Sequence, residues 1–380
     1  MSKSPFVYGN TVSKDAFTDR EKDSKKLYSN LVGGVNTMLI SPRRWGKSSL
    51  VEKVITSINK NEEKYKTVII DLFSASDESE FLEQFAQEII KASSSKFEDW
   101  VQNSKTVFKN LIPKISLGLD PFSDFSISFE PKELIKFKAE ILNLPEKIAI
   151  KKNIKFIIAL DEFQNLATFP EFEKLEKNMR AIWQRQKNVT YCLFGSKRHM
   201  MLDIFNNTSK PFYKFGDIIL LQKIDRESWV NFIVESFKKS DKEISRNLAV
   251  QISNLMQNHS WYIQQFSHYI WNKTNKSVDE EIINLALEEL INANMPLFQK
   301  EVEIISTTQL NLLKAIVKNE TKYTSARVMQ EYKLGTPRNV SKNIQSLLKK
   351  DIIDYSDNNY LFLDPLFEIW FKKYILNQSS

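Results

Sequence analysis

The stretch from Asn36 to Ile58 constrains the fold more than any other part of the sequence. A short apolar run, "NTMLIS" at 36–41, leads into the loop "PRRWGKSS" at 42–49. Apolar residues then recur with the 3.6-residue period of a helix that buries one face. They are Leu50, Val51, Val54, Ile55 and Ile58. A strand, a loop ending in Gly-Lys-Ser and a helix form the order in which a phosphate-binding loop is built, so this stretch predicts a nucleotide site.

Each position of the loop can be compared with what phosphate binding requires. Gly46 lets the backbone approach the phosphates, Lys47 reaches the β- and γ-phosphates, and the Ser48 hydroxyl can bind Mg²⁺. The glycine that usually opens the motif is replaced by Ser41, which is followed by Pro42. A small residue is tolerable there if the backbone needs no positive φ. Because Gly-Lys-Ser also arises by chance, the loop needs a second half of the site to support it.

A second apolar strand supplies that half. The run "FIIALDEF" at 156–163 ends in Asp161 and Glu162. In a P-loop protein the first acid would hold Mg²⁺ through water, and the second would polarise the water that attacks the γ-phosphate. Taken alone, two acids at a strand end are more typical of a helix cap. Together with the upstream loop, they predict an ATP site with Mg²⁺ bound by Ser48 and Asp161.

Further apolar runs at 67–73, 189–196 and 217–224 alternate with helical patterns, one of them at about 132–150. This alternation predicts an α/β P-loop NTPase core, a parallel sheet with helices on both faces. Between 93 and 132, "KISLGLD" and "DFSISFE" alternate apolar and polar residues, which predicts a β-hairpin insertion.

The pattern after the core is different. From 225 to 303 it is helical throughout, and 304–380 contains short helical patterns followed by two short strands around a polar turn. The sequence therefore predicts a core over 1–224, an all-α lid over 225–303 and a winged helix-turn-helix domain over 304–380.

Composition limits the class of protein. With 42% hydrophobic and 27% charged residues, the 380-residue chain is suited to bury a core and is not disordered. No apolar run approaches the ~20 residues that span a bilayer, and no signal peptide is evident, so we expect a cytoplasmic protein without membrane contact. The single cysteine, Cys192, excludes a disulfide framework and is expected in the core of its strand.

Three segments together resemble a known family. "ISPRRWGKSSL", "IIALDEFQNL" and "YCLFGSKRHMM" are similar to the archaeal-type ATPases, in the MalT- and NACHT-related branch of the AAA+/STAND P-loop NTPases. The resemblance covers nearly the whole chain. It implies a slow ATPase with a nucleotide-binding core, a helical lid and a C-terminal winged helix.

The resemblance also assigns roles. "FTDREKDSKKL" resembles a short N-terminal motif that brings Phe17 near the adenine, and Ser196 corresponds to a polar sensor beside the γ-phosphate. His259 resembles a lid histidine facing the nucleotide, although Ser260 stands where a proline is common. The simpler interpretations are a turn serine and a surface histidine. The implied nucleotide-binding set is Ser41, Pro42, Arg43, Arg44, Trp45, Gly46, Lys47, Ser48, Ser49, Phe17 and His259, and the implied catalytic set is Glu162, Lys47 and Ser196.

One expected feature is missing. Where AAA+ rings offer an arginine finger to a neighbouring subunit, this chain has Lys210 and Lys214. Lysine lacks the planar fork of a guanidinium. Arg180, Arg185 and Arg198 are alternatives, but solvation at the surface explains them more simply. Activation by a neighbouring subunit in a ring is therefore in doubt, although a homo-oligomer or another protein partner stays open.

The C-terminal region raises a second hypothesis. "TPRNVSKNIQSLLKK" at 336–350 would be a recognition helix with Val340, Ile344, Leu347 and Leu348 facing inward, and four basic residues would be available to duplex DNA. These are Arg338, Lys342, Lys349 and Lys350. From 306 to 380 there are 11 Lys and Arg against 7 Asp and Glu, a net +4 of the chain's +7.

Three functions follow from these features. The favoured one is an ATP-dependent conformational switch. The alternative is a DNA-acting ATPase associated with transposition, replication or defence. A nucleotide-binding scaffold that barely hydrolyses ATP is disfavoured by Glu162, which such a scaffold would not need.

Overall fold

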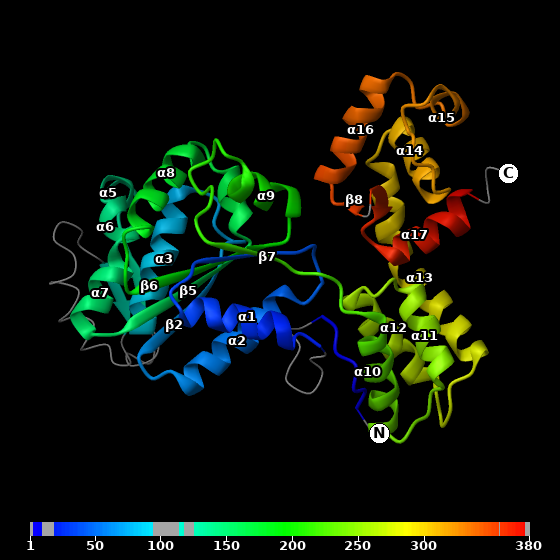
Figure 1. Cartoon of the computed structure of the whole chain (residues 1–380), viewed down its shortest axis with the longest axis horizontal. Coiled ribbons are helices and arrows are strands. Elements are labelled where there is room, and N and C mark those ends of the chain that lie inside the picture. The colour runs from blue at the N-terminus through cyan, green and yellow to red at the C-terminus, as the bar shows by residue number, and fades with distance from the viewer. Residues whose placement is uncertain (1–2, 10–18, 94–113, 118–124, 357, 377–380) are drawn as a thin grey trace. The chain divides into compact units, whose positions relative to one another are not determined.

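A computed structural model of the chain describes residues 3–9, 19–93, 114–117, 125–356 and 358–376 (Figure 1). The chain divides into two compact units. The core unit comprises Arg20–Arg43 and Lys47–Gln222, and the second unit comprises Met1–Asp19, Arg44–Gly46 and Lys223–Ser380. Within the described residues, no helix is long and apolar enough to cross a membrane.

A five-stranded parallel sheet forms the centre of the core unit, in the order β2-β5-β6-β1-β7. Its strands are β1 (Thr37–Ile40), β2 (Tyr65–Asp71), β5 (Lys155–Asp161), β6 (Val189–Gly195) and β7 (Asp217–Leu220). Every residue of β1 and β6 is buried, as expected for apolar strands that are covered on both faces. The predicted parallel sheet is confirmed.

Helices cover both faces of this sheet. α1 and α2 lie on one side, and α8 and α9 lie on the other (Figure 1). The helices of the core unit are α1 (Glu21–Val32), α2 (Lys47–Asn61), α3 (Glu78–Ser93), α5 (Pro131–Lys136), α6 (Lys138–Leu142), α7 (Leu144–Lys152), η2 (Phe163–Thr168), α8 (Phe172–Trp183) and α9 (Arg198–Asn206). The single helix predicted at about 132–150 is wrong, because three short helices occupy this region. Pro145 opens α7, where its missing N–H is tolerated, whereas within a continuous helix it would remove a backbone hydrogen bond.

The predicted hairpin insertion is only partly within the described residues. β3 (Lys114–Leu117) and β4 (Phe125–Ser128) pair antiparallel, with Lys114 opposite Ser128 and Leu117 opposite Phe125. This is the pairing that the alternating pattern predicts. Residues 94–113 and 118–124, the remainder of this stretch before β4, lie outside the described residues.

The second unit is helical and then mixed. α10 (Arg226–Lys239), α11 (Arg246–Leu255), α12 (Ser260–Lys273) and α13 (Glu280–Glu303) come first. α14 (Thr307–Val317), α15 (Ala326–Glu331) and α16 (Pro337–Lys349) precede a hairpin of β8 (Ile353–Ser356) and β9 (Asn359–Phe362), and then α17 (Pro365–Phe371) and η3 (Lys372–Leu376). A helical region followed by a winged helix was predicted and is confirmed.

Two features of this unit were not predicted. α17 begins where the Asp364 carboxylate accepts the backbone N–H groups of Leu366 and Phe367. The helix is only 7 residues long, too short to show a clear period. In addition, Phe6 is buried among the lid helices, with its ring 5.3 Å from that of Phe237.

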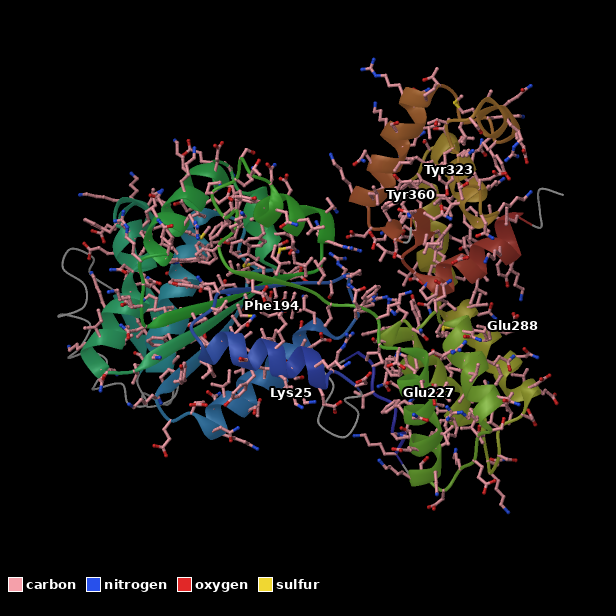
Figure 2. All side chains as sticks on the ribbon, in the orientation of Figure 1. Lys25, Phe194, Glu227, Glu288, Tyr323 and Tyr360 are labelled. Carbon is pink, nitrogen blue, oxygen red and sulfur yellow. The ribbon has the colours of Figure 1, made fainter. Side chains whose placement is uncertain are left out.

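The third helix of the winged region has the predicted two faces. Val340, Ile344 and Leu347 are buried, and Leu348 is half-buried. On the wing side, the Tyr323 hydroxyl donates to Asn359 Oδ1 (2.9 Å), and its ring lies 5.8 Å from that of Tyr360 (Figure 2). The apolar side of α16 is thus part of the core, and its polar side is left exposed.

Candidate active site

The loop between β1 and α2 has an unusual backbone at two positions. Positive φ angles fall on Arg44 (65°) and Gly46 (88°), and Ser41 has none. A Cβ on Gly46 would meet no atom within 4 Å, so the backbone angle, and not lack of space, favours glycine there. Ser41 is buried and its hydroxyl donates to the Pro42 carbonyl (3.1 Å). The condition under which Ser41 was expected to be tolerated, an ordinary φ, is met.

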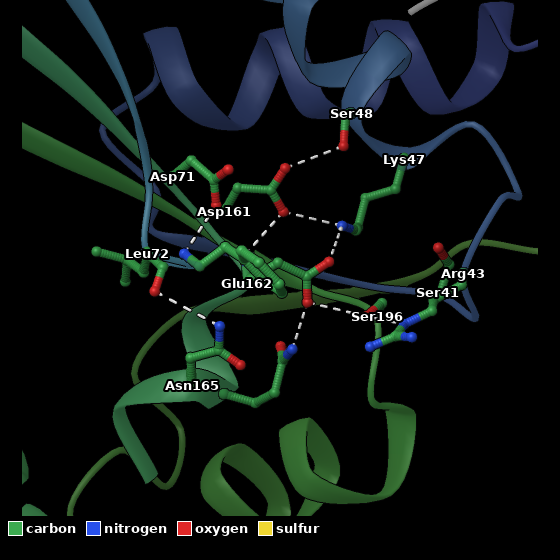
Figure 3. A network of polar contacts seen from close by, with 12 residues as sticks. Ser41, Arg43, Lys47, Ser48, Asp71, Leu72, Asp161, Glu162, Asn165 and Ser196 are labelled. Atoms are coloured by element: carbon green, nitrogen blue, oxygen red, sulfur yellow. Dashed lines mark hydrogen bonds and ion pairs between the residues drawn. The ribbon is translucent and has the colours of Figure 1, made fainter. Parts of the chain in front are cut away.

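Lys47 and Ser48 at the start of α2 converge on one carboxylate at the end of β5 (Figure 3). The Lys47 ammonium lies 2.9 Å from Asp161 Oδ1, and the Ser48 hydroxyl donates to Asp161 Oδ2 (3.0 Å). Lys47 is only 7% exposed, and its ammonium lies 5.1 Å from the centre of the Phe194 ring, which Figure 2 labels. Two segments 114 residues apart in sequence therefore form one site.

Glu162 follows Asp161 in sequence and lies beside Lys47. Its backbone is left-handed (φ 50°), which turns the chain directly after β5 into η2. One carboxylate oxygen, Oε1, is 3.6 Å from Lys47 Nζ, while Oε2 accepts the Ser196 hydroxyl (2.8 Å) and the Gln164 amide. No cap bond from the Glu162 side chain to η2 forms, so the helix-cap interpretation of this residue is not supported.

The charge of Glu162 depends on these neighbours. Burial alone would raise the pKa of Glu162. The Lys47 ammonium and the hydrogen bonds from Gln164 and Ser196 outweigh burial, and the pKa is lowered. Glu162 is therefore ionised at neutral pH and is able to accept a proton.

Ser196 follows the last residue of β6 and is buried. Besides donating to Glu162, its oxygen accepts from Arg43 Nε at 3.4 Å. Ser196 therefore links Arg43 of the loop to Glu162. The structure thus brings together Arg43, Lys47, Ser48, Asp161, Glu162 and Ser196.

These donors fit a magnesium ion bound together with a nucleotide. A hydroxyl and a carboxylate within 3.0 Å of each other are the two protein groups that a P-loop offers to Mg²⁺. Among the described residues, no three His, Cys, Asp or Glu side chains cluster as a metal site would require. In such a site the other ligands of Mg²⁺ are phosphate oxygens and water.

Two residues of this region were missed from the sequence. Gln164 is 1% exposed and bonds to Glu162. Its only signal was its position two residues after the acidic pair, and η2 was not predicted. Asp71 ends β2 directly opposite Asp161 in the sheet, and its carboxylate accepts the backbone N–H of Phe73 (2.9 Å). The available signal was an acid near the end of the apolar run at 67–73.

Other predicted nucleotide-binding residues belong to the second unit. There, the Arg44 guanidinium lies 4.8 Å from the Trp261 ring centre, and the Lys223 ammonium lies 5.5 Å from the Trp45 ring centre. Ser49 and Pro42, which belong to the core unit, are buried. Phe17 lies outside the described residues.

His259 precedes α12 as its N-cap residue and is 4% exposed, so the surface interpretation is wrong. Its Nδ1 has no hydrogen-bond partner within the described part of the chain. Burial, reinforced by the positive charges of Lys223 and Arg44, lowers the pKa of His259 to about 3. His259 is therefore a neutral imidazole at neutral pH.

Lys210 and Lys214 occupy the place where an arginine finger was expected. Lys214 has a left-handed backbone (φ 53°), and its ammonium lies 5.3 Å from the Tyr213 ring centre. Of the alternative arginines, Arg180 contacts the Phe215 ring (5.0 Å), which explains it as a packing residue of its own unit.

The basic residues of α16 are exposed. For Arg338, Lys342 and Lys349, the described residues include no carboxylate within ion-pair distance, while Lys350 donates to the Ile304 carbonyl (2.8 Å). By contrast, Arg327 on the neighbouring α15 pairs with Glu320 and Glu331 (2.5 and 2.7 Å).

Comparisons with known proteins agree with this architecture. A family described as a probable winged helix domain matches residues 296–373. The Walker-type ATPase paby2304 of Pyrococcus abyssi is similar in structure, with a TM-score of 0.67 and 19% identity over 94% of this chain and 97% of that one. The Aeropyrum pernix ORC2 protein, solved in ADPNP–ADP complexes, gives a TM-score of 0.56 and 14% identity over 95% of both chains. A search of curated proteins found no match.

Identities this low establish the fold alone. The chain has the fold of AAA+ P-loop ATPases, with a C-terminal winged helix. The boundaries predicted for its three domains stay predictions.

Proposed function

We propose that the protein binds and hydrolyses ATP and acts as a nucleotide-dependent switch. One observation carries the proposal: Lys47 and Ser48 meet the Asp161 carboxylate at 2.9 and 3.0 Å, with the ionised Glu162 adjacent. This is the set of groups that phosphoryl transfer to water needs, namely a cation for the phosphates, two ligands for Mg²⁺ and a proton acceptor. A site that only stored nucleotide would have no use for Glu162.

The residues would divide the work as follows. Lys47 would exchange its carboxylate partners for the β- and γ-phosphates, and backbone N–H groups at the start of α2 would surround the β-phosphate. Mg²⁺, held by Ser48 and through water by Asp161, would neutralise charge on the β- and γ-phosphate oxygens. Ser196 and Arg43 lie where the γ-phosphate end of the nucleotide is expected.

The reaction itself is a displacement at phosphorus. The water oxygen forms a bond to the γ-phosphorus, and the bond from that phosphorus to the β–γ bridging oxygen breaks. ADP leaves with the electron pair of the broken bond. Glu162 accepts a proton from the attacking water. It can do so because its lowered pKa keeps the carboxylate ionised before the reaction.

A switch requires that ATP favour one conformation of the chain over another, since a ligand shifts an equilibrium only through differential affinity. The supporting observation is that Lys47 is engaged by two carboxylates in this structure and would have to release them for phosphates. The change of conformation would alter binding to another protein or to a second copy of the chain.

The test is to separate binding from turnover. Glu162→Gln should bind the unhydrolysable analogue ADPNP as the natural protein does and lose ATP hydrolysis by about 100-fold or more. Glu173→Gln, the same change on the exposed face of α8, is the matched control and should hydrolyse normally. Normal hydrolysis by Glu162→Gln would falsify the assignment of the proton acceptor.

A second function, a DNA-acting ATPase, is supported by the exposed cations of α16 that lack carboxylate partners within the described residues. Residues 351–364, which include the wing formed by β8 and β9, contain four Asp and no Lys or Arg. Contact with DNA would therefore be made by α16 and not by the wing. Steady-state ATP hydrolysis with and without duplex DNA, over a salt series, distinguishes the two. Stimulation that falls steeply with salt supports the DNA-acting function, and a rate indifferent to DNA supports the switch.

A further inference from the structure

Gln164 is a buried polar side chain that the mechanism above does not use. It lies in η2, two residues after Glu162, and is 1% exposed. Its Nε2 donates to Glu162 Oε2, while its Oε1 is buried and has no hydrogen-bond partner among the residues the structure describes. A buried amide oxygen without a partner destabilises a fold, so an apolar residue would serve stability better here.

The neighbouring strand leaves a space shaped for this amide. Gly195, the last residue of β6, has no side chain. A Cβ there would lie 1.9 Å from Gln164 Oε1, and 3.0 Å from both Gln164 Cδ and the Met201 sulfur. Gly195 has no positive φ, so the close approach of the amide, and not the backbone angle, requires glycine. Any larger residue at 195 would push the Gln164 amide out of place.

The amide acts on the orientation of the carboxylate. Gln164 Nε2 and Ser196 Oγ both donate to Oε2 of Glu162, so the other oxygen, Oε1, stays on the side of Lys47. The last torsion of a glutamate side chain is otherwise broad and roughly two-fold, so a carboxylate without donors would present either oxygen. Two donors on one oxygen select a single orientation.

We propose that Gln164 is a positioning residue that fixes the rotation of the Glu162 carboxylate, and that Gly195 provides the space its amide needs. The inference rests on the proposed function, because it takes Glu162 as the proton acceptor. The amide donates to Glu162 and not to the phosphate-binding loop, so its loss should impair turnover and spare nucleotide binding.

The first experiment uses Gln164→Met, which retains the volume of the side chain and removes the donor. The kcat for ATP hydrolysis should fall by about tenfold or more, while ADPNP affinity changes by less than about twofold. The melting temperature should not fall, because the unpartnered oxygen is removed as well.

The second experiment is a double-mutant cycle. Gly195→Ala should reproduce the loss of kcat, because its Cβ displaces the amide. Combined with Gln164→Met, it should add little, since both changes remove the same interaction. Gln186→Met is the matched control. The Gln186 amide donates to the Leu142 carbonyl (3.0 Å), in the same unit but in a different network, so kcat should be unchanged.

The outcomes separate this inference from the proposed function. If Glu162→Gln abolishes hydrolysis while Gln164→Met and Gly195→Ala both retain the natural kcat, the positioning role is wrong and the ATPase stands. If Glu162→Gln hydrolyses normally, the proposed function fails. If the loss of kcat in Gln164→Met is accompanied by a lower melting temperature and weaker ADPNP binding, the positioning role is also wrong, because Gln164 would then be a purely structural residue.

Discussion

The charged side chains at the end of β5 and those along α16 are arranged in opposite ways. Lys47 is 7% exposed and is engaged by Asp161 and Glu162 at 2.9 and 3.6 Å. Arg338 and Lys342 are exposed, and neither has a carboxylate partner in the part of the chain that the structure describes. The first set of charges is balanced within the protein, and the second is not.

The difference indicates what each set is suited to. A buried, mutually paired set is held in place before any ligand arrives, which is the condition for electrostatic catalysis. An exposed set of one sign contributes little to folding and instead creates a field that attracts a polyanion. Substitutions in the first region should therefore change chemistry, and substitutions in the second should change affinity for a partner.

The largest effect is expected from Lys47→Ala. Removing the ammonium deprives the phosphates of their cation and leaves two neighbouring carboxylates that repel an anion, so ADPNP affinity should fall by about 1000-fold or more. Isothermal titration calorimetry measures this directly. Lys60→Ala, near the exposed end of the same helix, is the control. Retained affinity in Lys47→Ala would remove the basis for contrasting the two regions.

The double substitution Arg338→Glu with Lys342→Glu tests the other side of the comparison. If α16 contacts the DNA backbone, duplex affinity should fall by about 100-fold, and the slope of log K against log salt should decrease by about 2. Lys238→Glu with Lys239→Glu makes the same charge change on α10 and should have a smaller effect. Unchanged duplex affinity in the α16 variant would leave its exposed cations without a nucleic-acid role. ATP hydrolysis without DNA should be normal in both variants.

How far the sequence predicted these regions depended on the kind of signal. Buried parallel strands are continuous apolar runs, so the sheet was visible in runs such as 156–161, and the loop was visible in Gly46 and Lys47. Gln164 was not visible, because its role depends on the left-handed turn at Glu162 and on the space at Gly195 on the neighbouring strand β6. Local patterns report periodicity, whereas contacts between distant segments leave no periodic trace.

A pH-dependent prediction concerns His259. Its folded pKa of about 3 is below the ordinary value of 6.5, so the unfolded chain binds the proton more tightly. The stability from keeping this imidazole neutral is fully present above about pH 6.5 and is lost progressively as the pH falls toward about 3. At about pH 5 the loss is about 2 kcal/mol. Denaturant unfolding of wild type and His259→Gln at about pH 7.5 and pH 5 measures this. An equal acid loss in both proteins would show that His259 is not the group responsible.

The smallest effect is expected at the position where the phosphate-binding motif departs from its usual form. Ser41 has an ordinary φ, so Ser41→Gly should leave ADPNP affinity within about twofold, and the added freedom of the unfolded chain should cost about 0.5–1 kcal/mol of stability. Gly46→Ala is the contrasting change, because its φ of 88° strains any other residue even though a Cβ would meet nothing within 4 Å. Affinity should therefore fall at Gly46 and not at Ser41. The opposite ranking would mean that the first position of the loop, and not its turn at Arg44 and Gly46, shapes the phosphate site.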